Sequence, residues 1–200
     1  MRRLFALIPV LVLILTGCNT TPPVPALRYA PLADNTMALF RIGGAVDIGE
    51  FTGFSKREIT CRGGTEIRPP DNKTYTQYIR DAFFDELRQA GIFRINAPVT
   101  LTGEVTKVDF TSGFVSGGEW IIIITLHSSN GRSITVMENY PFDTRWAGNV
   151  ACFNVAQAFA PAVQGLIKGT INHPEFKDLL ITNTTHLQNP GTTFHLDVFE

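Results

Sequence analysis

One run of seven residues near the middle of the chain, Trp120–Leu126, places the strongest constraint on its fold. All of its residues except Thr125 are apolar. Successive side chains of a β-strand point to opposite faces of a sheet, so this strand carries apolar side chains on both faces. One set packs on the core and the other lies on the second face: either Trp120, Ile122 and Ile124, or Ile121 and Ile123.

The segments on either side of this run predict a three-stranded antiparallel meander. Before it, apolar residues alternate at period two over residues 99–110, with a change of parity near Lys107 that predicts a β-bulge. After it, Asn130-Gly131 predicts a type I′ hairpin turn, because both central positions of that turn need positive φ. A return strand follows over residues 132–142.

Two other segments have the helical period. Over residues 74–90, apolar side chains recur every three or four positions, and charged side chains, Glu86 among them, are assigned to the solvated side. A second apolar stripe begins near Asn149, a good N-cap, and ends before His173-Pro174. Asp81 and Asp85 lie four positions apart on the first helix and are interpreted as surface charges near arginines.

A first strand is predicted over residues 38–48, where apolar and polar residues alternate, and a long loop is predicted over residues 50–71. Both helices have one apolar face and need a common surface to cover. The order of elements therefore predicts an α+β fold, a two-layer sandwich in which a four-stranded sheet has two helices on one face, in the order β-α-β-β-β-α.

The N-terminus has the features of a secretory signal, because Arg2 and Arg3 precede an apolar run over residues 4–15. About 12 apolar residues are too few for a transmembrane helix, which needs about 20. The run ends in Leu15-Thr16-Gly17-Cys18, which resembles the lipobox of bacterial lipoproteins. The resemblance implies removal of residues 1–17 and acylation of Cys18, with palmitate among the acyl groups. An ordinary signal that happens to end near a cysteine is the alternative.

The residue after the cysteine bears on the compartment. In such lipoproteins an Asp at this position marks retention in the inner membrane, and this chain has Asn19. The resemblance therefore implies attachment to the outer membrane, facing the periplasm. We expect a Pro-rich extended tether over residues 18–36, a single domain over residues 37–181 and a mobile tail over residues 182–200.

With Cys18 acylated, Cys61 and Cys152 remain as a pair in an oxidising compartment. We predict a disulfide between them, which would close a loop of about 90 residues and constrain the unfolded chain. Two buried free thiols are the alternative.

Few residues point to catalysis or to a cofactor. The four histidines, His127, His173, His186 and His195, lack the spacing of a zinc site, and no nucleophile motif or phosphate-binding loop is present. Charged residues are sparse and mixed in sign, so nucleic-acid binding has no electrostatic basis. We therefore expect no metal, no cofactor and no enzymatic activity.

The expected domain resembles small envelope lipoproteins of the YajG-like, lipopolysaccharide-assembly and ABC-transport-auxiliary kinds in its architecture and its expected location in the cell envelope. This resemblance implies a non-enzymatic binding or assembly module, attached to the membrane through its lipid, with an envelope protein or lipid as partner. The candidate binding face is the uncovered side of the strand that holds Trp120, Ile121, Ile122, Ile123 and Ile124. Three alternatives remain open: cover of this face by tail, loop or tether, a lipid-carrying protein, and a hydrolase.

Overall fold

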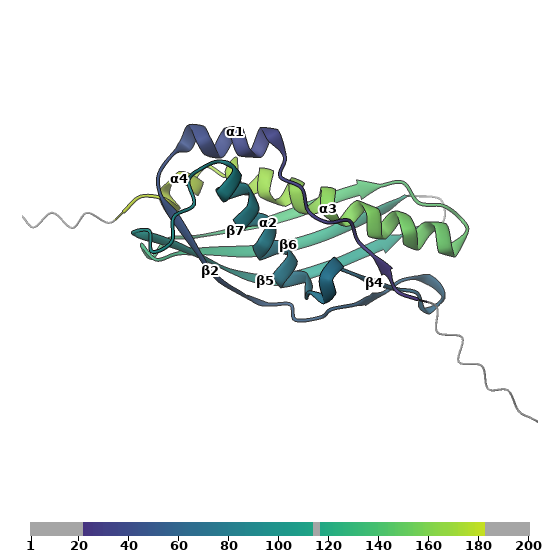
Figure 1. The fold of residues 1–200 in the computed structure, drawn as a ribbon. Coiled ribbons are helices and arrows are strands. Elements are labelled where there is room, and N and C mark those ends of the chain that lie inside the picture. The colour runs from purple at the N-terminus through teal and green to yellow at the C-terminus, as the bar shows by residue number, and fades with distance from the viewer. Residues whose placement is uncertain (1–21, 114–116, 183–200) are drawn as a thin grey trace, which may run out of the picture.

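The computed structural model describes residues 22–113 and 117–182. Its main sheet contains β2 (Val46–Gly53), β5 (Val99–Ser112), β6 (Gly118–Ser128) and β7 (Ser133–Phe142), in the spatial order β2-β5-β6-β7. β2 and β5 are parallel, and the other neighbours are antiparallel (Figure 1). The predicted three-stranded meander is therefore confirmed.

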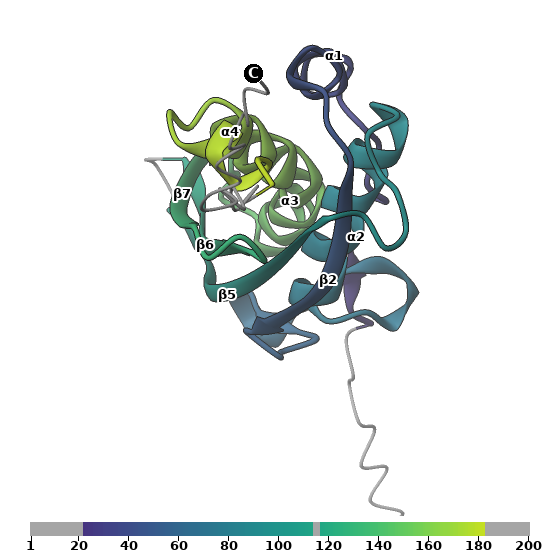
Figure 2. The same ribbon diagram turned by 90° about the vertical axis from the view of Figure 1, so that its left-hand side faces the viewer.

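The two long helices pack on the same face of this sheet. α2 (Tyr75–Gln89) connects the parallel strands β2 and β5, and α3 (Gly148–Ile171) follows β7. Figure 2 shows that the sheet curves around both helices. α2 begins with a capping box between Thr74 and Gln77. α3 begins at Gly148 without a side-chain cap, so the N-cap expected at Asn149 is wrong.

α3 is long and apolar enough to cross a membrane, with a mean hydropathy of 1.4 over its most apolar window. In this fold it is a core helix, because most of its apolar side chains are buried against the sheet and α2. A short helix, α4 (Phe176–Leu179), follows it and buries Phe176 and Leu179.

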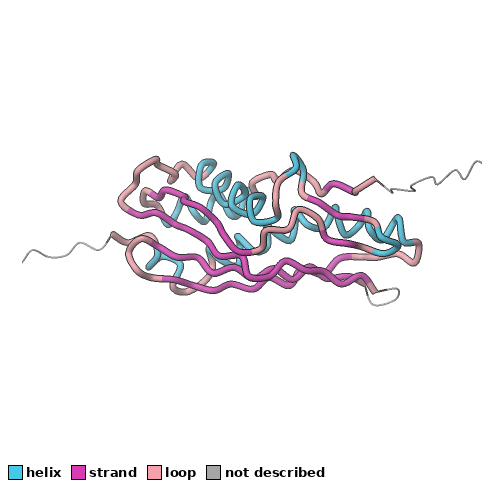
Figure 3. The backbone as a smooth tube through the Cα atoms, turned by 90° about the horizontal axis from the view of Figure 1, so that it is seen from below, coloured by secondary structure: helices cyan, strands magenta, loops and turns pink. Residues whose placement is uncertain are grey.

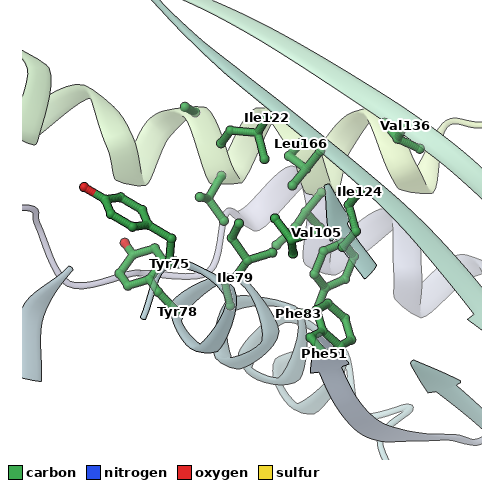
Figure 4. Close-up of a cluster of buried hydrophobic side chains, with 14 of the residues drawn as sticks. Phe51, Tyr75, Tyr78, Ile79, Phe83, Val105, Ile122, Ile124, Val136 and Leu166 are labelled. Carbon is green, nitrogen blue, oxygen red and sulfur yellow. The ribbon is translucent and has the colours of Figure 1, made fainter. Parts of the chain in front are cut away.

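The core between sheet and helices is filled by interlocking side chains. The Trp120 and Phe159 ring centroids lie 4.9 Å apart, and those of Tyr75 and Phe159 lie 5.0 Å apart. The Trp120 Nε1 donates a hydrogen bond of 2.9 Å to the carbonyl oxygen of Val155. Figure 4 shows side chains of α2, the sheet and α3 meeting in this core.

The long segment between β2 and α2 is ordered by a second, smaller sheet. This sheet has the order β1-β4-β3 and contains β1 (Val24–Pro25), β3 (Ile59–Thr60) and β4 (Glu66–Arg68). Two short 3₁₀ helices, η1 (Arg62–Gly64) and η2 (Pro70–Asn72), lie beside it. The predicted disulfide between Cys61 and Cys152 is present and joins this segment to α3.

The strand predicted over residues 38–48 is wrong over residues 38–45. Ala33–Ile42 form helix α1, and the strand begins only at Val46. Gly43 and Gly44 have φ values of 71° and 99°, and this left-handed backbone ends the helix before the strand. The observed burial reverses the predicted pattern, because Phe40, which the strand would have buried with Val46 and Ile48, is 66% exposed, and Leu39 is buried instead.

The N-terminal segment also differs from the extended tether expected up to residue 36. β1 pairs in parallel with β4, Ala26 is buried, and α1 begins at Ala33. The domain boundary expected at residue 37 is therefore too late for the described residues. The predicted signal peptide, Cys18 and residues 183–200 of the expected tail lie outside the described residues.

Two local predictions in the meander have different outcomes. The bulge near Lys107 is confirmed by a register shift between Val105 and Lys107. The two-residue type I′ turn is wrong, because Gly131 has a φ of 88° but Asn130 does not have positive φ. The Asn130 side chain instead donates hydrogen bonds to the carbonyl oxygens of Asp178 and Ile181. Figure 3 shows the long strands of the sheet extending along the length of the molecule.

Candidate functional site

The structure divides the predicted binding strand into two sides. Trp120, Ile122 and Ile124 are fully buried beneath the helices, so they belong to the core and cannot form an exposed face. Ile121 and Ile123 point to the opposite side of β6 and are half-buried. Of the five residues predicted for the binding face, these two can contact a partner.

The side of the sheet that carries Ile121 and Ile123 is called here the open sheet face. Cross-strand pairing defines its centre, because Ile123 lies between Lys107 of β5 and Met137 of β7, and Ile121 lies between two polar residues. The apolar centre is Ile121, Ile123 and Met137, and the polar residues Lys107, Asp109 and Asn139 lie beside it. Met137 is 60% exposed.

No helix or loop within residues 22–113 and 117–182 covers the centre of this face, since Lys107, Asp109, Met137 and Asn139 are all exposed. Both long helices occupy the opposite side of the sheet. A small apolar stripe thus lies on a polar sheet surface with charges of both signs beside it. Such a surface can bind a protein without any catalytic group.

A buried carboxylate that the sequence analysis assigned to solvent holds the N-terminal segment on the domain. Glu86 of α2 is fully buried and accepts hydrogen bonds from four groups of residues 29–36. Its Oε1 accepts from the Tyr29 hydroxyl at 2.6 Å, the Leu32 backbone N–H at 2.9 Å and the Asn35 Nδ2 at 3.3 Å. Its Oε2 accepts from the Thr36 hydroxyl at 3.0 Å.

The spacing of Glu86 in the sequence could have predicted its burial. Glu86 lies four residues after Ala82 and three after Phe83, both of which are buried on α2, so its position belongs to the apolar stripe. α1 and the segment before it cover this side of the helix. Burial, followed by the hydrogen bond and the charge of Glu86, raises the pKa of Tyr29 far above its usual value.

Of the two aspartates of α2, Asp81 has charged partners. Asp81 forms ion pairs with Lys73 at 2.9 Å and with Arg80 at 3.1 Å. Burial, followed by the charge of Asp81, raises the pKa of Asp85 above its usual value. Arg80 Nε also donates to the carbonyl oxygen of Gly49 at 2.9 Å, where the β2 register shifts.

Lys73, Arg80 and Asp81 line part of a surface hollow of about 840 Å³. Their charges stabilise the bulge in β2 and the start of α2, which supports the interpretation of Asp81 as a surface charge.

The histidines do not form a cluster where they are described. His127 is exposed on β6, and His173 lies in the turn after α3, where its Nδ1 accepts from the Glu175 N–H at 3.3 Å. His186 and His195 lie outside the described residues. Across residues 22–113 and 117–182, no group of three or more His, Cys, Asp or Glu side chains is arranged to hold a metal ion.

Comparison with known proteins gives a fold likeness only. No family model matches the sequence, and no curated protein matches it. The chain is similar to protein XCC0632 from Xanthomonas campestris, of family DUF330, with 12% identity and a TM-score of 0.51; the alignment covers 76% of this chain and 95% of that one. This likeness supports the α+β architecture.

A second solved structure is a PelC dodecamer from Paraburkholderia phytofirmans. It is 18% identical, with a TM-score of 0.35, and the alignment covers 62% of this chain and 90% of that one. This similarity is too weak to support an inference about structure or function.

Proposed function

We propose that the protein is a lipid-anchored lipoprotein of the bacterial envelope, and that it binds a protein partner through the open sheet face as a non-enzymatic binding or assembly module. The observation that carries the proposal is the apolar stripe of Ile121, Ile123 and Met137 on a sheet face that the described residues leave uncovered. Its location rests on Leu15-Thr16-Gly17-Cys18 after an apolar signal segment.

The composition of the face fits a protein partner. Protein interfaces combine an apolar centre with a polar rim, and methionine is enriched in them. Here the centre is two isoleucines and a methionine, and the rim includes Lys107 and Asp109, which are exposed. A partner with complementary charges would cover the stripe and leave the rim at the edge of the contact.

The compartment is supported by the disulfide. Bonds such as Cys61–Cys152 persist in the periplasm and are rare in the cytosol, where thiols are kept reduced. With Asn19 after the acylated cysteine, the proposed site of attachment is the outer membrane, facing the periplasm.

The other two classes lack a supporting observation in the described residues. A lipid carrier needs an enclosed apolar cavity, and the space between sheet and helices is occupied by the rings of Tyr75, Trp120 and Phe159. A hydrolase needs a nucleophile beside a base, and the hollow beside α2 is lined by ion-paired groups.

Site-specific photocrosslinking in intact cells tests the proposal. A photoreactive residue at Met137 is expected to capture one defined envelope protein, and Ile123→Lys is expected to abolish the adduct because it places a charge in the apolar centre. The matched control is Ile95→Lys, since Ile95 is 75% exposed and lies off this face. Both variants are expected to unfold at the same temperature as the unaltered protein.

Two outcomes contradict the proposed binding face. One is an adduct from Met137 that persists in Ile123→Lys while that variant remains folded. The other is an identical set of adducts from a photoreactive residue at Ile95, which would show that capture reflects crowding in the envelope rather than this surface.

A further inference from the structure

A second exposed apolar surface lies at the start of α3. Trp146 precedes the helix and is 81% exposed, Val150 is 40% exposed and Phe153 is 54% exposed. Val150 and Phe153, three residues apart, lie on one side of the first helical turns, and Trp146 immediately precedes the N-cap residue Ala147. These three residues, called here the anchor-end patch, contrast with the rest of α3, which is mostly buried.

The patch is joined to the small sheet. Cys152, within the first turns of α3, forms the disulfide with Cys61, and their Cα atoms lie 5.9 Å apart. Arg62 of η1 donates from Nη1 to the carbonyl oxygen of Arg145 at 3.1 Å and from Nε to the Ser112 hydroxyl at 3.2 Å. The start of α3, η1 and the end of β5 therefore form one end of the molecule.

The register of β1 directs the N-terminal chain to this same end. Val24 pairs with Ile67 and Pro25 with Arg68 in a parallel ladder. Because the strands are parallel, the described residues before Val24, Pro22 and Pro23, lie on the side of η1, which precedes Ile67 in the chain. Figure 1 shows that the described chain begins at the end of the molecule where α3 begins.

The distance to the proposed lipid is short. Four residue steps separate Cys18 from Pro22, where the described chain begins, and they span at most about 14 Å. An acyl group on Cys18 would therefore hold the anchor-end patch close to the surface of the bilayer.

We propose that Trp146, Val150 and Phe153 insert into the interface of the phospholipid bilayer that holds the Cys18 lipid. This inference rests on the proposed lipidation. Tryptophan favours the headgroup level of a bilayer, where its ring is buried and its N–H remains hydrated, and the neighbouring Arg145 can pair with lipid phosphates.

The contact would fix the orientation of the domain. The strands run along the length of the molecule, and the 14 residues of β5 extend about 40 Å from the anchor end. With that end on the bilayer, the strands stand away from the membrane and the open sheet face points sideways, where a partner can reach it.

Fluorescence provides a direct test because the chain has two tryptophans, and Trp120 is buried whereas Trp146 is exposed. The lipidated protein, after removal of residues 1–17, is reconstituted in phosphatidylethanolamine and phosphatidylglycerol vesicles with brominated acyl chains near the headgroup. We expect Trp146 emission to shift to shorter wavelength and to fall at least about twofold relative to unbrominated vesicles, since interfacial tryptophans occupy this layer.

Two variants isolate the signal. Trp146→Phe, which leaves only Trp120, is expected to show no quenching. The second variant, Ile95→Trp in the Trp146→Phe background, moves the tryptophan to another exposed position. Ile95 lies four residues before β5, at the end of that strand away from the anchor-end patch. The emission of this tryptophan is also expected to remain unquenched. Quenching of both exposed positions would indicate non-specific adsorption and would overturn the inference.

Mass spectrometry of Cys18 separates this inference from the proposed function. Acylated, vesicle-bound protein with unquenched Trp146 overturns the membrane contact and leaves the lipoprotein proposal intact. Unacylated Cys18 with quenched Trp146 overturns the lipoprotein proposal and keeps the contact. A blue shift that needs no vesicles and grows with protein concentration assigns the patch to contact between copies of the chain, which also overturns the inference.

Discussion

At the scale of single residues, Glu86 decides where the domain begins. An unpaired carboxylate is costly to bury, but a carboxylate that accepts several hydrogen bonds is stabilised by them. Four donors from residues 29–36 converge on Glu86. The segment before α2 is thereby attached to the core through a polar contact, and it adds α1 to the domain.

Replacement of Glu86 is expected to release this segment. Glu86→Ala leaves the Leu32 N–H and the Asn35 amide without their acceptor, so the free energy of unfolding should fall by about 3 to 5 kcal/mol. Glu86→Gln keeps one acceptor oxygen and should cost less. Urea unfolding measures the loss, and hydrogen exchange at residues 29–36 should accelerate in the Ala variant.

Arg88→Ala is the matched control, because Arg88 is exposed on the same helix. It should change stability by less than about 0.5 kcal/mol. A Glu86→Ala protein as stable as this control would show that the hydrogen bonds contribute nothing.

At the scale of elements, α2 brings two tyrosines into the core. Tyr75 and Tyr78 are buried, and their hydroxyls donate to the carbonyl oxygens of Ile67 at 2.8 Å and Leu27 at 2.9 Å. Burial raises the pKa of both phenols far above the usual value. The helix thus joins the aromatic core to β4 and to the segment after β1.

The raised pKa values predict a loss of stability at alkaline pH. Above about pH 10 the unfolded tyrosines release protons while the folded ones retain them, so rising pH favours the unfolded state by up to about 1.4 kcal/mol per pH unit for each tyrosine. Phenolate absorbance at 295 nm should therefore appear together with unfolding. Tyr78→Phe should make the free energy of unfolding fall less steeply with pH, because the contribution of one tyrosine is removed.

Comparison of the variant with the unaltered protein removes the contribution of lysines, which titrate in the same range. Full ionisation of the tyrosines near pH 10 with the fold intact would contradict the shielding of these phenols.

At the scale of the whole molecule, the Cys61–Cys152 disulfide connects parts of the chain 91 residues apart. The disulfide links the segment beside the small sheet to the start of α3, and Arg62 donates a hydrogen bond to the carbonyl oxygen of Arg145 nearby. Both proposed surfaces depend on this arrangement, because it sets the anchor-end patch beside the exit of the N-terminal chain.

Removal of the disulfide should weaken the whole domain. The double variant Cys61→Ala with Cys152→Ala is expected to lose about 2 to 5 kcal/mol of unfolding free energy, because its unfolded chain is no longer constrained by a long closed loop. Urea unfolding with and without reductant measures this. The reductant should lower the midpoint of the unaltered protein but not that of the variant, and equal midpoints under all conditions would contradict the prediction.

The sequence by itself determined the elements whose periodicity is long and undisturbed. Local patterns predict the meander, α2, most of α3 and the one-sided arrangement of the helices, because an apolar stripe at a fixed period allows one kind of element and needs one covered face. The cysteine pair was predicted separately, from the two cysteines that remain once Cys18 is assigned to the lipid. The same reasoning failed over residues 38–42, where a short apolar stretch fits both periods.

Only the tertiary structure decided which side of β6 is buried, because both sides of that strand are apolar and no local signal separates them. It also decided that Glu86 is a buried acceptor and that β1 pairs with β4, since both depend on segments far apart in the chain. Long-range contacts of this kind are determined by the packing of the whole domain. Therefore the exposed side of the predicted binding strand and the anchor-end patch became visible only in the folded molecule.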